Sequence, residues 1–328
     1  VGGKLGAGLG KDAPVIIADV IAHLEKQKLL EDKDIVGIDT GFRQLNEMTK
    51  GFKHGDLIII AARPGMGKTT ICLNLMNHVL KHGGGVVFFS LEMPAEQIML
   101  RMLSAKTSIP LQNIMTAKMD DEEWSRLSDA CDDMASRKLF VYDSGYVNIH
   151  QIRTQMRKLK SAHPEITLCV IDYIGLMMAT SNFSDRHLQI AEISRGLKLL
   201  ARELDMPIIA LSQLNRSLES RANKRPMLSD LRESGAIEQD ADMILFVYRD
   251  EVYREQEEKE AEKKAHAEGK EYVRKFVPNK IEEEAEIIVG KNRNGPVGTV
   301  EVIFQKEFTR FVDKSFGAAH VAEFNPNA

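Results

Sequence analysis

The stretch "AARPGMGKTT" (61–70) decides the fold class of this chain. It follows an apolar run at 56–62 and opens a segment with helical spacing. The template G-x-x-x-x-G-K-[ST] describes it, except that Ala62 occupies the first glycine position. Because strand, glycine-containing loop and helix follow in this order, the stretch predicts a phosphate-binding loop. The alternative is an ordinary strand–helix turn that happens to contain a lysine.

The residue types in this loop suit nucleotide chemistry. Its backbone N–H groups are expected to wrap the phosphates of ATP, with Gly65 and Gly67 permitting close approach. Lys68 is expected to pair with the β- and γ-phosphates, and the Thr69 hydroxyl is expected to bind Mg²⁺. The nucleotide-binding candidates of the loop are Gly65, Met66, Gly67, Lys68, Thr69 and Thr70.

Around the loop, short β-branched runs alternate with helical stretches. The expected strands are 56–62, 86–90, 139–143, 167–172, 207–212 and 242–248, with helical segments such as 94–105, 121–136 and 186–204 between them. Several of these runs are apolar throughout, as in a parallel sheet buried on both faces. The pattern predicts an α/β fold with a mostly parallel twisted sheet flanked by helices. Runs at 285–290, 299–304 and 308–312 are expected to add antiparallel edge strands.

Three polar residues lie where expected strands end, and open α/β sheets bind ligands at those ends. Asp172 ends the run "LCVID" (168–172) and is expected to hold Mg²⁺ through water; capping the strand is the alternative. Glu92, just after the second strand, is a candidate to orient the attacking water. Gln213 is a candidate sensor of the γ-phosphate. For Glu92 and Gln213 the alternative is a polar strand end without chemistry.

The stretch "KNRNG" (291–295) lies between two of the late apolar runs. Asn294 and Gly295 both tolerate positive φ and predict a tight hairpin turn. Lys291 and Arg293 are two residues apart, so both point to one side of an extended strand. They are either solvated turn cations or groups that reach for a negative partner. Phosphoryl-transfer sites often receive a second cation from another subunit, and the planar fork of Arg293 suits phosphate oxygens.

Composition gives further limits. The 328 residues are 43% hydrophobic and 28% charged, which is ordinary for a globular protein. No apolar run of about 18 residues occurs, so no membrane span is expected. The formal net charge is −4, so any nucleic-acid contact must come from a local patch. Cys72, Cys131 and Cys169 are expected to be buried free thiols in a reducing cytosol.

Two segments stand apart from the α/β pattern. Behind a Gly-rich lead at 1–11, residues 15–30 have helical spacing and predict a helix that packs on its own domain or on a neighbouring subunit. Residues 251–284 are dense in charges of both signs, with Glu255–Lys259 and Glu260–Lys264 in the favourable i,i+4 order. They predict a solvated helix inserted between core strands, interpreted as a surface insertion without chemistry.

Six stretches together resemble the ATPase domain of bacterial replicative helicases of the DnaB type. They are "GIDTGFRQLNEMTKGFKHGDLIIIAARPGMGKTT" (37–70), "FFSLEMP" (88–94), "VIDYIGLM" (170–177), "IIALSQLNR" (208–216), "RPMLSDLRESGAIEQDAD" (225–242) and "KNRNGPVGTV" (291–300). The resemblance covers roughly residues 15–316, and alanine at position 62 is usual in that family. It implies a RecA-like P-loop NTPase fold, a homohexameric ring around single-stranded DNA, and ATP bound between subunits.

The resemblance also implies roles for single residues in the ATP site. Glu92 is the catalytic carboxylate, and Arg101 reaches the phosphate site from the helix that follows. Gln213 is the γ-phosphate sensor. Arg293 is the arginine finger that completes a neighbour's site, and Lys291 is its companion.

The stretch "LRESGAIEQ" (231–239) resembles the loop that grips the DNA backbone. In that role Arg232 supplies a cation for phosphate, and Gly235 lets backbone N–H groups approach it. Glu233 is expected to orient Arg232 rather than to meet phosphate. The alternative for this region is a polar helix start capped by Ser229.

These interpretations define a domain plan and a function. Residues 1–34 form a Gly-rich lead and a linker helix that docks on a neighbouring subunit, 35–316 form the ATPase domain, and 317–328 form a flexible tail. The expected protein is a cytoplasmic, ATP-hydrolysing 5′→3′ DNA helicase that uses Mg²⁺. Primase and a helicase loader are partners by resemblance, although the resemblance does not include the N-terminal domain that meets primase. The alternatives are a filament-forming recombination or repair ATPase of the RecA-like group, and a P-loop ATPase that does not bind nucleic acid.

Overall fold

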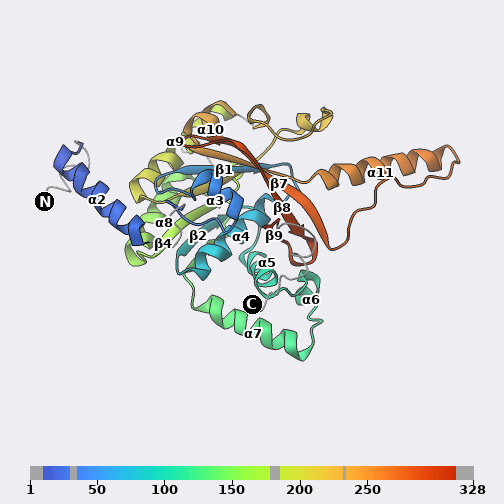
Figure 1. Ribbon diagram of the computed structural model, residues 1–328, viewed down its shortest axis with the longest axis horizontal. Helices are drawn as coiled ribbons and strands as arrows, with labels where there is room; N and C mark the ends of the chain where they lie inside the picture. The colour runs from blue at the N-terminus through green and yellow to red at the C-terminus, as the bar shows by residue number, and fades with distance from the viewer. Residues whose placement is uncertain (1–9, 30–34, 178–184, 232–233, 315–328) are drawn as a thin grey trace.

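A computed structural model describes residues 10–29, 35–177, 185–231 and 234–314 of the chain. Figure 1 shows an α/β body from which helices α2 and α11 project at opposite ends. The body is built around one nine-stranded sheet with the order β3-β2-β4-β5-β1-β6-β7-β8-β9.

The sheet has a parallel part and an antiparallel edge. The first six strands of this spatial order, β3-β2-β4-β5-β1-β6, pair in parallel. Strands β7, β8 and β9 follow β6 in the sheet and pair antiparallel. The strands are β1 (Leu57–Ala62), β2 (Gly85–Ser90), β3 (Leu139–Tyr142), β4 (Ile166–Asp172), β5 (Ile208–Gln213), β6 (Met243–Tyr248), β7 (Glu282–Asn292), β8 (Gly298–Gln305) and β9 (Arg310–Asp313). The predicted fold class is therefore confirmed, including the antiparallel strands at the C-terminal edge.

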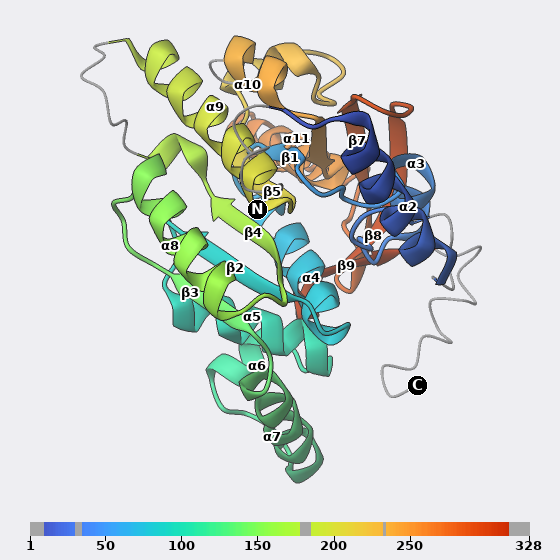
Figure 2. The ribbon, with the colours of Figure 1, turned by 90° about the vertical axis from the view of Figure 1, so that its left-hand side faces the viewer.

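The helices are α2 (Ala13–Leu29), α3 (Arg43–Thr49), α4 (Lys68–Lys81), α5 (Ala95–Thr107), α6 (Leu111–Met115), α7 (Asp121–Ala135), α8 (Ile149–Ala162), α9 (Arg186–Leu204), α10 (Ser234–Asp240) and α11 (Asp250–Ala267). Helices α4 to α10 connect the parallel strands, whereas α2 and α3 precede β1 and α11 lies between β6 and β7. Short 3₁₀ turns occupy η1 (Ile174–Leu176), η2 (Arg216–Ser220), η3 (Leu228–Asp230) and η4 (Lys306–Phe308). Figure 2 shows α8 and α9 on one face of the parallel strands and α4 and α5 on the other.

The core lies in the centre of this three-layer arrangement. Every residue of β1, β2 and β6 is buried, because helices cover both faces of these strands. Each fully buried Ile, Leu or Phe side chain contributes roughly 1.5–3 kcal/mol relative to an exposed one. Continuous apolar runs such as Leu57–Ala62 are thus the natural sequence of central parallel strands.

Two helix starts show how local sequence sets the boundaries. The Asp120 side chain accepts from the Glu123 N–H, and the Glu123 side chain accepts from the Asp120 N–H, which forms a capping box at α7. Asn148 and Gln151 form the same reciprocal pair at α8. Both pairs satisfy N–H groups that the first helical turn leaves without an intrahelical partner.

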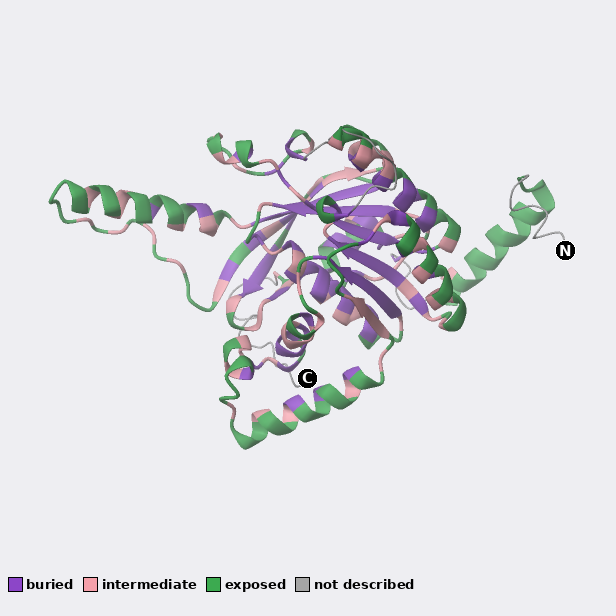
Figure 3. Ribbon diagram, turned by 180° about the vertical axis from the view of Figure 1, so that it is seen from behind, coloured by how far each residue is buried: buried purple, intermediate pink, exposed green. Residues whose placement is uncertain are grey.

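Helix α2 confirms the helical spacing predicted for 15–30, and none of its residues is buried. Figure 3 shows it green along its length. Its apolar side chains at Val15, Ile17, Val20, Ile21 and Leu24 are between 46 and 58% exposed. The helix therefore does not pack into the core of its own domain. No helix among the described ranges combines the length and apolar character that crossing a membrane needs.

The charged segment differs from the prediction in its second half. Helix α11 ends at Ala267, and residues 268–281 return along it without forming a helix or strand. Residues 282–284 already belong to β7. We call residues 250–281 the arm. The helical half follows from the i,i+4 charge pairs, of which Glu255–Lys259 is observed at 3.9 Å.

The hairpin predicted at 291–295 is confirmed, because it joins the antiparallel strands β7 and β8. Two details were wrong. Asn294 and Gly295 do not have positive φ. Glycine is needed at 295 for space, because a Cβ there would lie 2.6 Å from the Asn292 amide nitrogen and 3.2 Å from the Met48 carbonyl oxygen. All three cysteines are free, but only Cys72 and Cys169 are buried; Cys131 is exposed on α7.

Candidate active site

Parallel strands bring the candidate residues to one edge of the sheet. The phosphate loop follows β1, Asp172 ends β4, and Gln213 ends β5. In the strand register Ala62 lies opposite Gln213, and Ser90 at the end of β2 lies opposite Asp172. Glu92 lies two residues beyond Ser90. The carboxyl ends of four neighbouring strands thus converge where α/β sheets bind ligands.

The backbone of the loop has the glycine geometry that the motif predicts. Gly65 has φ +80° and Gly67 has φ +101°, both in the left-handed region that side chains disfavour. Gly67 also needs to be small, because a Cβ there would lie 2.8 Å from the Phe311 ring on β9. Space around Gly65 is open. The side of the loop at Gly65 is therefore accessible, and the side at Gly67 is packed.

Lys68 lies at the centre of the site. Its ammonium is 3.1 Å from Asp172 Oδ1 and 3.6 Å from Glu92 Oε2, and it lies 4.5 Å from the centre of the Tyr173 ring. Lys68 is 7% exposed and Asp172 is fully buried. The structure thus brings together the three charged residues that sequence analysis assigned to phosphate, metal and water.

The Asp172 carboxylate is shared between two residues of the loop. Lys68 holds Oδ1, and the Thr69 hydroxyl donates to Oδ2 at 2.8 Å. A buried carboxylate beside a hydroxyl offers the hard oxygen ligands that Mg²⁺ prefers. Among the described residues no three His, Cys, Asp or Glu side chains converge on a metal position. Thr69 and Asp172 are the two residues here that could hold Mg²⁺, which usually keeps several water or phosphate oxygens as ligands.

The other two loop candidates are buried parts of the same turn. Met66 is 3% exposed, and its N–H donates to the Arg63 carbonyl oxygen at 3.2 Å. Thr70 is 7% exposed in the first turn of α4. Arg63 in turn donates to the Leu214 carbonyl oxygen at 2.9 Å and pairs with Glu219 at 2.6 Å. These two contacts of Arg63 join the phosphate loop to the segment that follows β5.

Gln213 and Arg101 are placed differently. Gln213 is part-exposed at the tip of β5, next to the first residues of the phosphate loop. Arg101 is part-exposed on α5, and among the described residues its side chain has no hydrogen-bond or ion-pair partner. Both side chains have polar groups that remain available to a ligand.

Lys291 and Arg293 lie on one side of the turn, as predicted, and both contact their own chain. The Lys291 ammonium donates to the Glu238 carbonyl oxygen. Arg293 pairs with Asp242 at 2.7 Å and donates to the Gln239 carbonyl oxygen at 3.1 Å. These carbonyls belong to the C-terminal end of α10, where cations are favoured. Burial and the neighbouring Arg293 cation lower the pKa of Lys291.

Sequence analysis missed the role of Asp242. This buried carboxylate accepts from Lys198 at 2.5 Å and from the Leu57 N–H at 2.9 Å, in addition to Arg293. Burial and Asp242 together raise the pKa of the nearby Asp56 to about 6. In the sequence, the only indication of this role was a carboxylate directly before the apolar run of β6. Its three partners lie in distant segments, so the sequence did not reveal them.

Sequence analysis also missed Arg249, which follows β6. Its guanidinium donates to the Gly65 carbonyl oxygen in the phosphate loop at 2.9 Å. In the sequence this residue is one cation at the start of a long charged segment, so nothing local distinguishes it.

The proposed DNA loop is described only in part. Arg232 and Glu233 lie outside the described residues. Gly235 is exposed near the start of α10, and apart from its chain neighbours and its own helix backbone no described atom lies within 4 Å of where its Cβ would be. Leu231, just before the loop, forms an isolated antiparallel bridge with Leu214, the residue after Gln213.

A family model described as the DnaB-like helicase C-terminal domain matches residues 37–313. Two replicative DNA helicases are similar in sequence. The protein of Helicobacter pylori strain 26695 is 48% identical over 307 residues, which cover 90% of this chain and 62% of that relative. The protein of Geobacillus stearothermophilus is 44% identical over 284 residues, which cover 86% of this chain and 58% of that relative.

Two solved structures are similar in fold. One is an isolated ATPase domain with a TM-score of 0.79 and 36% identity, over 93% of this chain and all of that one. The other is a DnaB-like replicative helicase, studied with its primase interactions, with a TM-score of 0.77 and 35% identity, over 93% of this chain and 67% of that one. Both confirm the RecA-like architecture expected from the sequence.

The chain spans about three-fifths of the length of the curated relatives it matches. The family match covers the phosphate loop, Glu92, Asp172, Gln213 and the turn at 291–295. The chain belongs to the family of DnaB-like helicase C-terminal domains.

Proposed function

We propose that this chain is the motor of an ATP-dependent replicative DNA helicase. Six copies form a ring, hydrolyse ATP at their interfaces, move 5′→3′ on single-stranded DNA and unwind duplex DNA at the replication fork. The observation that carries this proposal is the Lys68–Glu92–Asp172 group beside a phosphate loop, in a domain that belongs to a helicase family.

The chemistry of hydrolysis is divided among these residues. Lys68 neutralises charge on the β- and γ-phosphates, and its contact with Glu92 places that carboxylate at the phosphate end of the site. Glu92 is half-exposed, so water reaches it, and it orients the attacking molecule as general base. Thr69 and Asp172 hold Mg²⁺, which neutralises phosphate charge when bound.

A neighbouring subunit completes the site in this proposal. Arg293 acts as the arginine finger, with Lys291 beside it. Within the subunit that binds the ATP, Arg101 adds a third cation from α5. Arg293 is 44% exposed at its side chain, so its fork is accessible from outside the subunit. Helix α2 docks on the neighbouring subunit, which accounts for the exposed apolar side chains along it.

A continuous path supports coupling between ATP and DNA. Gln213 senses the γ-phosphate at the tip of β5 in this mechanism. The next residue, Leu214, donates its N–H to the Ala62 carbonyl oxygen at 3.1 Å and bridges to Leu231. A shift at Gln213 therefore acts on the start of the loop at 231–239, which carries Arg232, Glu233 and Gly235 for the DNA backbone.

Partners follow from the proposed function. Single-stranded DNA and the other subunits are direct partners, and a helicase loader and primase are further partners in this proposal. The relative studied with primase supports such an interaction for the family in general terms. Work at a bacterial replication fork places the protein in the cytoplasm.

The test combines particle shape with activity. Purified protein is expected to form closed rings in negative stain, to hydrolyse ATP faster with single-stranded DNA, and to displace a labelled strand when given Mg²⁺ and ATP. Long filaments on DNA would instead identify a recombination ATPase. An ATPase rate that is indifferent to DNA would identify a P-loop ATPase without a nucleic-acid role.

A further inference from the structure

The arm is joined to the body at Arg249, which lies between β6 and α11. Its guanidinium Nη1 donates to the Gly65 carbonyl oxygen at 2.9 Å. Gly65 is part of the phosphate loop and lies 184 positions away in the sequence. The start of a segment interpreted as a surface insertion thus contacts the nucleotide site.

Arg249 is held firmly on its other sides. Its Nε donates to Glu283 Oε1 at 2.6 Å, and Nη2 contacts the same oxygen. Its guanidinium lies 4.5 Å from the centre of the Phe304 ring, a favourable cation–aromatic distance. The Arg249 side chain is 16% exposed and that of Glu283 is 1% exposed. The direction of the Arg249 fork is therefore fixed.

The base of the arm supports Glu283 through a second carboxyl group. Glu251, in the first turn of α11, lies beside Glu283, and burial together with this neighbour raises the pKa of Glu283. Oε2 of Glu251 and Oε2 of Glu283 are both buried and have no hydrogen-bond partner among the described residues. A hydrogen bond between the two carboxyl groups would need a shared proton. Glu251 also accepts from the Asn279 N–H at 3.2 Å and lies 3.6 Å from the Lys306 ammonium. Both ends of the arm meet at this point.

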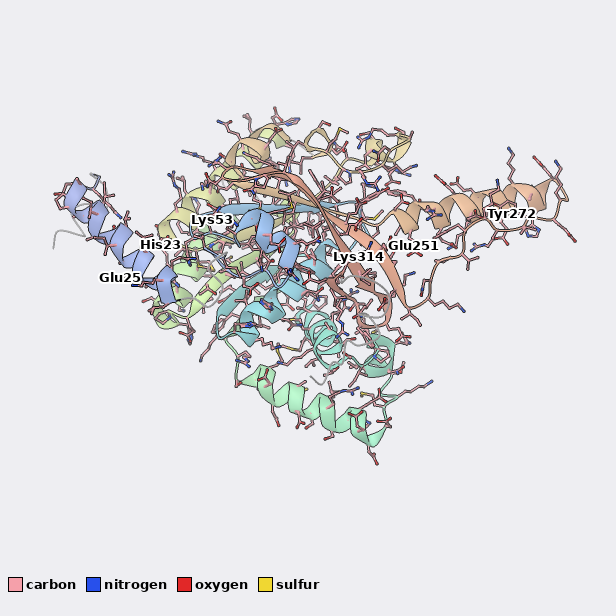
Figure 4. All side chains as sticks on the ribbon, viewed as in Figure 1. His23, Glu25, Lys53, Glu251, Tyr272 and Lys314 are labelled. Carbon is pink, nitrogen blue, oxygen red and sulfur yellow. The ribbon has the colours of Figure 1, made fainter. Side chains whose placement is uncertain are left out.

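The arm itself is folded back on α11. Tyr272 donates to Glu258 at 2.8 Å, and Arg274 pairs with Glu255 at 2.9 Å. Figure 4 shows Glu251 where the arm leaves the body and Tyr272 far out along it. These contacts give the arm a defined shape from its base outward.

Arg249 acts on one peptide unit of the phosphate loop. The peptide between Gly65 and Met66 is planar, so its C=O and N–H point in opposite directions. Arg249 holds the C=O, and the Arg63 carbonyl oxygen accepts from the N–H at 3.2 Å. The plane is thus held from both sides, directly before Gly67 and Lys68. Its orientation determines where the following N–H groups point.

We propose that Arg249 is a positioning residue of the phosphate loop, held in place by Glu283 and the base of the arm. This inference rests on the proposed function, because it assumes that residues 61–70 bind ATP. It gives the base of the arm a role in nucleotide binding. In this proposal Arg249 acts through the loop, at the Gly65 carbonyl oxygen, and not on the phosphates directly.

The test compares three variants by titration with a fluorescent ATP analogue in Mg²⁺ without DNA. Arg249→Gln is expected to weaken binding about tenfold, as the loss of one charge-assisted hydrogen bond implies. KM for ATP rises by a similar factor, whereas kcat stays within about threefold of wild type. Arg249→Lys retains a cation for Glu283 but lacks the fork that also reaches Gly65. It is expected to keep the wild-type melting temperature and still bind the analogue several-fold more weakly.

Arg225→Gln is the matched control. Arg225 pairs with Glu286 on the same strand, β7, at 3.0 Å, and its guanidinium lies 5.3 Å from the Tyr248 ring. It does not contact the phosphate loop in the described structure. Nucleotide affinity is expected to stay at the wild-type value in this variant.

The outcomes separate this inference from the proposed function. Wild-type protein that fails to bind the analogue overturns both. Wild-type binding with unchanged affinity in Arg249→Gln overturns the role of Arg249 alone. Full recovery of affinity in Arg249→Lys would show that charge, rather than the fork, matters and would also overturn it. If Arg249→Gln misfolds, the pair Arg249→Gln with Glu283→Gln removes the unpaired buried carboxylate, and the same tenfold loss is expected.

Discussion

Arg293 and Asp242 form an ion pair within a single subunit, with 2.7 Å between Nη1 and Oδ1. The same arginine is the proposed finger for a neighbour's ATP. One guanidinium fork cannot grip the Asp242 carboxylate and a γ-phosphate in full at the same time. Under the proposed function the two anions would compete for Arg293, and its transfer from Asp242 to phosphate would be a step at the subunit interface.

The first prediction concerns this step. Mixed rings that contain Arg293→Ala subunits are expected to lose ATPase activity more steeply than the fraction of mutant subunits rises. Each mutant subunit disables a site on its neighbour, and coupled turnover around the ring spreads the loss. The measurement is ATPase rate against mixing ratio in the presence of single-stranded DNA. Mixing with Lys314→Ala, a part-exposed residue just after β9 that pairs with Glu301, provides the control. A strictly proportional loss would contradict coupled action.

The second prediction concerns the stability that Asp242 provides. Asp242→Asn leaves Lys198 and Arg293 without their shared anion and is expected to lower the free energy of unfolding by about 2–4 kcal/mol. The Arg293 side chain is part-exposed, so water can solvate its guanidinium when Asp242 is replaced. The decrease in the free energy of unfolding is therefore smaller than for a fully buried ion pair. Guanidinium unfolding followed by circular dichroism measures it. Asp132→Asn, an exposed change on α7, is expected to stay within about 0.5 kcal/mol of wild type. Equal stability of the two variants would exclude the proposed role.

The third prediction concerns Glu92. Glu92→Gln is expected to lower kcat for ATP by about 10²- to 10⁴-fold, the usual effect of removing a general base. ATP binding and ring formation are expected to remain, because Lys68 keeps its contact with Asp172 at 3.1 Å. Single-turnover hydrolysis and analogue binding separate the two effects. Glu96→Gln, in the first turn of α5, is the control and is expected to turn over normally. Normal turnover in Glu92→Gln would remove this carboxylate from the mechanism.

The fourth prediction concerns the DNA loop. Arg232→Ala is expected to weaken binding to single-stranded DNA and to reduce the slope of log K against log salt by roughly 0.7, the value for one phosphate contact. Basal ATPase without DNA is expected to persist. Binding isotherms at several salt concentrations give the slope. Arg153→Ala on α8 is a control on a different element. An unchanged slope in Arg232→Ala would place the DNA contact elsewhere.

Sequence alone predicted the features that depend on local pattern. Continuous apolar runs located the parallel strands within one or two residues, because buried strands need apolar side chains on both faces. The gathering of Lys68 and Asp172 at one edge of the sheet also followed, since the loop after β1 and the end of β4 meet there, but their direct contact at 3.1 Å was not predicted. The resemblance to known helicases added roles that spacing alone left open.

Other features depend on contacts between distant segments. The charge pairs that predicted a helix over 251–284 are local, whereas the return at 268–281 is fixed by contacts such as Arg274 with Glu255. Gly295 looked like a positive-φ turn residue, but it is required because Asn292 and Met48 approach it closely. The contact of Arg249 with Gly65 joins two segments that are 184 positions apart, and no local pattern indicates it.

The last prediction uses the carboxyl pair at the base of the arm. Burial, followed by the neighbouring Glu251 carboxyl group, raises the pKa of Glu283 from 4.5 to about 7. Arg249 opposes this rise, and Lys306 is the other cation beside the pair. In the folded protein the proton is therefore retained to higher pH than in the unfolded chain. Between about pH 4.5 and 7 the folded protein therefore binds one more proton than the unfolded chain. The contribution of Glu283 to the free energy of unfolding falls as pH rises through that window.

Glu283→Gln tests this sign, because glutamine keeps the shape and the donor of the protonated acid at every pH. The free energy of unfolding of wild type, relative to Glu283→Gln, is expected to fall by about 1–2 kcal/mol between about pH 4.5 and 7.5, after allowance for screening by Arg249 and water. Denaturant unfolding of both proteins at several pH values measures the difference. Glu301→Gln, at an exposed position paired with Lys314, controls for the loss of a carboxylate. A relative stability that stays level, or that rises with pH, would show that Glu283 and Glu251 do not share a proton.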